Sequence, residues 1–99
     1  MPQYILEARK PVKVDDIRKW GTWFALDTNR RVAQTNVTSK IRVSTVFLGI
    51  DHGYDEDVPI LFETMIFGGE HDEYQERYTT WEEAEIGHAK AVKMCKELL

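Results

Sequence analysis

The C-terminal segment of this 99-residue chain carries the pattern that most constrains the fold. Apolar side chains recur there at helical spacing and lie within about 120° of one another on a helical wheel, with one histidine among them. The stripe consists of Trp81, Ala84, His88, Ala91, Val92, Cys95, Leu98 and Leu99. Thr79 and Thr80 are each followed three residues later by a glutamate, which predicts a capping box at the start of the helix. A helix with one apolar stripe requires a second layer to cover that stripe.

Two long segments upstream of the helix have the composition of strands. Residues 41–50 and 59–67 are rich in β-branched and aromatic side chains, and Gly68 and Gly69 close the second segment. The short connection between them predicts antiparallel pairing. Residues 51–59 and 68–77 have turn composition and are expected to form loops.

The N-terminal part of the chain predicts shorter elements. Residues 4–6 have the composition of a short strand, and Asp15 or Asp16 is a candidate N-cap for a short helix that Gly21 would end. Residues 22–26 and 31–35 favour a hairpin, because the intervening residues have turn chemistry. We therefore predict a single α+β domain over residues 1–99, with an antiparallel sheet of about four strands and the C-terminal helix packed on one face.

Composition narrows the class of protein. Cys95 is the only cysteine, which excludes an intrachain disulfide and a cysteine-rich zinc site. The first residues lack the pattern of a secretion signal, and no apolar stretch approaches the roughly 20 residues that cross a bilayer. We expect a cytoplasmic protein.

Charge is unevenly distributed along the chain. Residues 1–45 carry nine Lys or Arg against four Asp or Glu, whereas residues 46–99 carry four against thirteen. The sequence leaves open whether the two halves occupy separate faces, which would suit partners of opposite charge, or interleave and neutralise each other.

Three blocks in residues 41–92 carry a family resemblance. They are residues 43–52, residues 59–69, and residues 78–84 followed by Gly87 and His88. In this order they resemble a family of small uncharacterised proteins of tailed phages and prophages. The acidic segment 53–58 departs from the glycine-rich and proline-rich segment of family members. The resemblance implies a phage origin and a host-cell cytoplasmic location, and it implies no mechanism.

The candidate ligand-binding residues are Asp51, His52, Glu63, Thr64 and His88. A buried histidine needs a hydrogen-bond partner, and Glu63 or a backbone group is the expected partner of His88. Glu63 lies about four strand residues from the hairpin end, roughly 13 Å, which argues against a site shared with Asp51. Glu63 on an exposed sheet face is the alternative.

Acidic loops form the candidate partner-binding surface. A host protein with a basic surface would suit them. The residues are Asp55, Glu56, Asp57, Asp72 and Glu73. Gly68, Gly69 and Gly87 permit the close approach of a second copy or a small ligand, so a homo-oligomer is expected.

The function that we predict is that of a non-enzymatic phage-type accessory protein, with a possible counter-defence role, which binds a host protein or a small ligand and uses no cofactor or metal. One alternative is a nucleic-acid-binding protein that uses the basic and aromatic N-terminal half. Its key residues would be Arg18, Lys19, Arg30, Arg31 and Arg42, with Trp20, Trp23 and Phe24. The second alternative is a metal-dependent hydrolase, although the histidines lack the helical spacing of a zinc-hydrolase motif.

Overall fold

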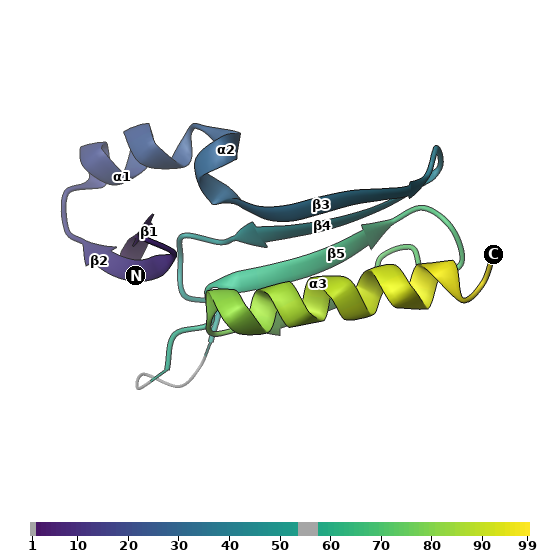
Figure 1. Ribbon diagram of the computed structural model, residues 1–99. Helices are drawn as coiled ribbons and strands as arrows, with labels where there is room; N and C mark the ends of the chain where they lie inside the picture. The colour runs from purple at the N-terminus through teal and green to yellow at the C-terminus, as the bar shows by residue number, and fades with distance from the viewer. Residues whose placement is uncertain (1, 54–57) are drawn as a thin grey trace.

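A four-stranded antiparallel sheet forms the centre of the computed structural model, which describes residues 2–53 and 58–99. Its strands lie in chain order: β3 (Arg31–Thr38), β4 (Ile41–Phe47), β5 (Phe62–Phe67) and β6 (Gln75–Tyr78). The long helix α3 (Trp81–Lys96) runs along one face of this sheet (Figure 1). The predicted α+β class and the helix on one face of an antiparallel sheet are confirmed.

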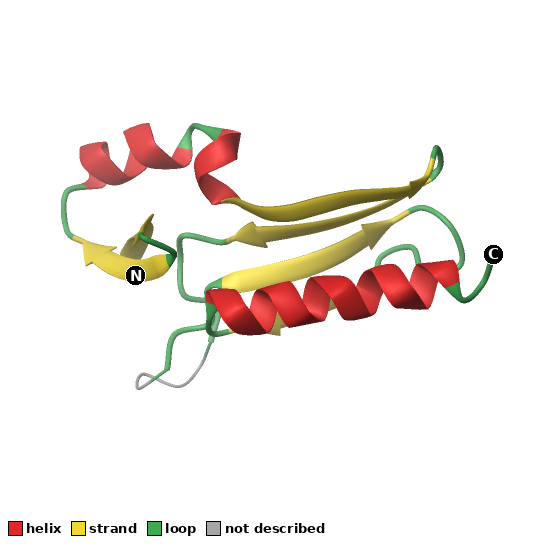
Figure 2. Ribbon diagram, in the orientation of Figure 1, coloured by secondary structure: helices red, strands yellow, loops and turns green. Residues whose placement is uncertain are grey.

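The N-terminal elements lie at one end of the main sheet (Figure 2). β1 (Gln3–Glu7) and β2 (Lys10–Val14) form a two-stranded antiparallel ribbon, followed by α1 (Ile17–Phe24) and α2 (Asp27–Arg30). The ribbon is hydrogen-bonded to the segment that follows β4, where the Tyr4 amide donates a 2.8 Å hydrogen bond to the Gly49 carbonyl.

The predicted hairpin of residues 22–26 and 31–35 is wrong in its first strand. Thr22 to Phe24 complete α1, which continues through Gly21 rather than ending there. The Asp16 side chain accepts hydrogen bonds from two backbone amides at the start of this helix, as the predicted cap requires. Trp20 and Phe24 then stack with ring centroids 4.6 Å apart, a contact that helical i, i+4 spacing creates and strand spacing does not.

β6 takes the place of the missing strand. Its first three residues lie in the segment 68–77, which was expected to be a loop, and its sequence Gln-Glu-Arg-Tyr has no apolar alternation. Pairing with the free edge of β5 organises it, and Phe62 faces Tyr78 in the register. The number of strands in the sheet was predicted correctly, but the identity of one strand was not.

Helix α3 begins as predicted. The Thr80 side chain accepts from the Glu83 amide while the Glu83 carboxylate accepts from the Thr80 amide, which is the capping box. The helix ends at Lys96, so Leu98 and Leu99 lie beyond it and are 51% and 73% exposed. These two residues are therefore not part of the buried stripe.

The interior between α3 and the sheet has two apolar clusters. One is formed by Val43, Ile66, Ala91 and Cys95, and the other by Phe47, Leu61, Phe62 and Ala84. Each combines residues of β4, the β5 segment and α3, so the helix and the sheet share one interior. None of the helices in the described residues has the length and apolarity that a bilayer crossing requires.

Candidate functional site

The two faces of the main sheet differ because strand side chains alternate between them. Val43, Thr45 and Phe47 point toward α3 and are fully buried. Their neighbours Arg42, Ser44 and Val46 lie on the other face, which we call the open face. Cross-strand register extends the open face over the whole sheet. It comprises Arg31, Gln34, Asn36, Arg42, Ser44, Val46, Glu63, Met65, Phe67, Gln75 and Arg77.

A buried polar layer separates the two apolar clusters on the covered face. The His88 ring lies between two threonines: Nδ1 is 2.7 Å from Thr45 Oγ1, and Nε2 is 2.8 Å from Thr35 Oγ1. Thr45 Oγ1 is also 2.5 Å from Thr64 Oγ1. Burial lowers the pKa of the His88 imidazole, so the neutral ring is the favoured form. Both ring nitrogens are engaged by hydroxyls, which makes the layer a structural network.

The predicted contact between His88 and Glu63 is wrong. Thr64 and Glu63 are adjacent in β5, so they point to opposite faces, and only Thr64 joins the network of His88. Glu63 accepts hydrogen bonds from Gln75 Nε2 and, at 2.9 Å, from Arg77 Nε on the open face. Glu63 thus lies on the sheet face away from the helix, but it is buried at 9% exposure, so the alternative of an exposed position is also wrong.

Asp51 and His52 lie in the loop after β4. Asp51 Oδ1 accepts 2.8 Å hydrogen bonds from the amides of Gly53 and Ile60, so this carboxylate closes its own loop. The side chain of His52 is exposed. The five candidate ligand residues therefore lie in three places and do not form one pocket.

The candidate acidic surface falls partly outside the described residues, since Asp55, Glu56 and Asp57 lie there. Asp72 and Glu73 are exposed in the connection between β5 and β6. The Asp72 carboxylate accepts a 2.7 Å hydrogen bond from the Gly68 amide, which stabilises this turn. For Asp72 the structure shows a local structural role.

Positive charge gathers on the β3–β4 side of the open face. A hollow of about 600 Å³ at the tip of the β3–β4 hairpin is lined by Lys40 and Arg42, and a second hollow of about 260 Å³ is lined by Arg30, Arg31 and Arg42. Arg42 contributes to both hollows, so they adjoin. We call Arg30, Arg31, Lys40 and Arg42 the basic track.

The basic track has little internal neutralisation. Asp27 is the one carboxylate that lines either hollow, and it pairs with Arg30 at 2.5 Å. Within residues 2–53 and 58–99, Arg31, Lys40 and Arg42 have no ion-pair partner. The track therefore keeps a net positive charge.

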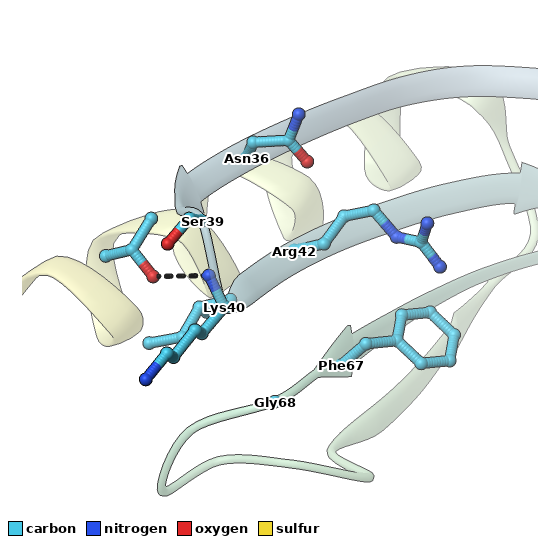
Figure 3. A pocket seen from close by; sticks show the side chains of 8 residues that line it. Asn36, Ser39, Lys40, Arg42, Phe67 and Gly68 are labelled. Carbon is cyan, nitrogen blue, oxygen red and sulfur yellow. Dashed lines mark hydrogen bonds between the residues drawn. The ribbon is translucent and has the colours of Figure 1, made fainter.

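One row of side chains crosses the track. Asn36, Arg42 and Phe67 are successive cross-strand partners on β3, β4 and β5, and they project from the same face (Figure 3). The Arg42 guanidinium lies over the Phe67 ring, 4.8 Å from its centroid. Phe67 is 40% exposed. The row therefore presents a cation, an aromatic ring and an amide side by side.

The basic residues singled out from the sequence are partly brought together. Arg30, Arg31 and Arg42 share one hollow, whereas Arg18 and Lys19 line a separate hollow beside Trp23 and Leu26 on α1 and its end. Trp23 packs against the core, whereas Trp20 stacks on Phe24, and Phe24 adjoins the basic track because the Arg30 guanidinium lies 4.3 Å from its ring centroid. Sequence reasoning missed Phe67 and Asn36, although the alternation of residues 63, 65 and 67 was a signal for Phe67.

Metal ligands are not clustered in the part of the chain that the structure describes, and its one cysteine is buried. No group of three or more His, Cys, Asp or Glu side chains is arranged to hold a metal ion in residues 2–53 and 58–99. The Cys95 thiol is 2% exposed, and burial raises its pKa. Such a thiol is the opposite of an activated nucleophile.

Comparisons with known proteins return no family model, no curated protein and no solved structure that matches this chain. The resemblance to phage proteins stays a prediction, and the geometry of the open face carries the functional argument.

Proposed function

We propose that the protein is a non-enzymatic binding protein that uses the open face of its main sheet to bind an anionic partner. The observation that carries this proposal is the basic track, in which three of four cations lack an ion pair within the described residues. Cations that keep their charge at the surface attract and orient anionic groups.

The state of the titratable groups supports binding over catalysis. A hydrolase would need His88, Glu63 and the Asp51–His52 pair to converge in one pocket that solvent can reach. Instead His88 is bonded to two threonines, Glu63 to Arg77, and Asp51 to loop amides. The three groups therefore belong to separate networks and, with the His88 ring buried, they form no shared proton-transfer site within the described residues.

The expected phage origin is compatible with this role. An accessory protein in the host cytoplasm would meet anionic surfaces on host proteins, nucleotides and nucleic acids. The proposal differs from the acidic-loop hypothesis in the charge of the expected partner. The contact surface is now a basic face, so the partner is anionic rather than basic.

Heparin, a sulfated polyanion, tests the proposal without knowledge of the natural partner. We expect the wild-type protein to bind a heparin column at low salt, and the double variant Arg31→Glu with Arg42→Glu to elute at clearly lower salt. The matched control is Lys93→Glu with Lys96→Glu, which changes net charge equally at exposed positions of α3. Equal losses in both variants, or no retention of the wild type, would overturn the proposal.

A further inference from the structure

We infer that the anionic partner is single-stranded nucleic acid, bound along the basic track with a base stacked on the Arg42–Phe67 pair. This inference rests on the proposed function and adds the chemical class of the partner. It depends on three properties of the open face: the spacing of its cations, the planar groups beside them, and the polar side chains that flank both.

The cations extend along the strands rather than forming one spot. Arg31 pairs in register with Val46, four residues along β4 from Arg42, which corresponds to roughly 13 Å of strand. Lys40 lies just beyond Arg42 at the hairpin tip. A line of cations matches a chain of phosphates, which carries one charge for each nucleotide.

The Arg42–Phe67 pair provides a surface for stacking. A guanidinium is planar, and unpaired bases stack on aromatic rings and on Arg planes alike. In this row Phe67 is 40% exposed, and the Arg42 guanidinium lies 4.8 Å from the centroid of its ring. A base can therefore extend the stack in the way that sheet surfaces bind single strands.

Amide and hydroxyl side chains flank this stack on the open face. Asn36 is the cross-strand partner of Arg42, and Gln34 is the partner of Ser44 in the next row. Asn36 and Gln34 are exposed. An amide offers both a donor and an acceptor, which suits the edge of a base that has left its duplex.

Other occupants fit the same face less well. A duplex hides the faces of its bases, so it would use the cations and leave the stacking pair unused. A second copy bound face to face would oppose one basic track with another. A second copy that offered its acidic loops would make a heterologous contact, which closes only if the rotation between copies happens to form a ring. An acidic protein would neutralise the cations but provide no planar group for Arg42 and Phe67.

Fluorescence anisotropy with labelled oligonucleotides tests the inference. The probes are a mixed-sequence single strand of about 12 nucleotides, the corresponding duplex, and unlabelled heparin as competitor. We expect the single strand to bind more tightly than the duplex, and its affinity to fall steeply with salt. Phe67→Leu, which removes the ring and keeps an apolar side chain, should weaken binding about tenfold.

Arg42→Lys separates stacking from charge. Because lysine keeps the cation and loses the plane, this variant should lose single-strand affinity about tenfold while the salt slope and the heparin retention persist. Ile86→Ala, at an exposed position of α3 that is 72% exposed, is the control and should bind as the wild type does. Thermal unfolding confirms that each variant is folded.

The outcomes separate this inference from the proposed function. Three results would overturn the nucleic-acid inference while heparin retention persists: no binding of the single strand, equal affinity for duplex and single strand, or no effect of Phe67→Leu. In each case the anion-binding face would remain. The partner would then be an acidic protein or a sulfated ligand. Loss of heparin binding as well would overturn both.

Discussion

The two faces of the main sheet, which are built from the same strands, differ in how their polar side chains are paired. On the covered face, the groups of the buried polar layer are bonded to one another: His88 engages Thr35 and Thr45, and Thr45 engages Thr64. On the open face, Arg31 and Arg42 have no ion-pair partner in the part of the chain described by the structure. Adjacent residues such as Ser44 and Thr45 therefore have different roles, one on the open face and one in the buried polar layer. Substitutions in the polar layer should change stability, and substitutions in the basic track should change binding.

The contrast also explains why a buried histidine does not indicate a site here. The polar layer lies between two apolar clusters and fixes the position of α3 along the sheet, since a shift of the helix would leave His88 without its threonines. A buried polar group whose neighbours fill its bonding capacity stabilises the fold, whereas an exposed cation without an ion-pair partner can bind another molecule. Arg31, Lys40 and Arg42 meet this description within the described residues, which is why we propose the open face as the binding surface.

Gly87→Ala should give the largest effect on the covered face. A Cβ at Gly87 would overlap the ring and hydroxyl of Tyr78, which projects from β6 against the helix. The overlap forces α3 away from the sheet and outweighs the higher helix propensity of alanine, so we expect a loss of about 3 kcal/mol in the free energy of unfolding. Urea denaturation measures it.

Gly21→Ala is the matched control for that substitution. Gly21 also lies inside a helix, α1, and an added Cβ would meet no atom within 4 Å. This variant should therefore be stabilised by about 0.5 to 1 kcal/mol. If both glycine variants behave alike, the close contact between α3 and Tyr78 does not exist.

Thr45→Val should give the next effect. The hydroxyl of Thr45 joins His88 Nδ1 to Thr64, and all three residues are buried, so removing it leaves two buried groups short of a partner. We expect a loss of about 2 kcal/mol. Ser44→Ala changes the adjacent hydroxyl on the open face and should stay within about 0.5 kcal/mol of the wild type. A smaller loss for Thr45→Val than for Ser44→Ala would contradict the assignment of the two faces.

The elements that were predictable from the sequence are those with a strong period or a local cap. Helix α3 has both, and β4 and β5 have long β-branched runs. β6 was missed because its four residues form a strand only when the edge of β5 is available for pairing. The end of α1 was assigned to a strand because Trp23 and Phe24 favour strands, and the i, i+4 stack with Trp20 overrides that preference.

The candidate site was less predictable than the fold. Glu63 and Thr64 were grouped together, although neighbours in a strand cannot face the same way. Alternation together with the register of β4 and β5 assigns Arg42 and Phe67 to one face of the sheet. It does not say which face α3 covers, because that depends on packing between residues distant in sequence.

The pH dependence of stability tests the polar layer without changing its shape. Burial lowers the pKa of His88 in the folded protein below its unfolded value, so the unfolded chain binds the proton first as pH falls. Stability from this group is complete above the unfolded pKa of about 6.5 and decreases below it, by at most about 1.4 kcal/mol per pH unit. His88→Gln should remove that part of the slope between pH 7 and 5, and an unchanged slope would show that the ring titrates normally.

The smallest effect is expected for the Glu63–Arg77 pair, which separates the basic track from the rest of the open face. The Arg77 side chain is 41% exposed, so water screens its attraction to Glu63, and a double-mutant cycle with Glu63→Gln and Arg77→Gln should give a coupling of about 0.5 kcal/mol. The double variant keeps the net charge of the protein and leaves Arg31, Lys40 and Arg42 in place. Its affinity for heparin and for the single strand should therefore match that of the wild type. A loss of binding comparable to that of Arg42→Lys would mean that the partner contacts the whole open face rather than its β3–β4 side, and the track would then have to be extended across β5 and β6.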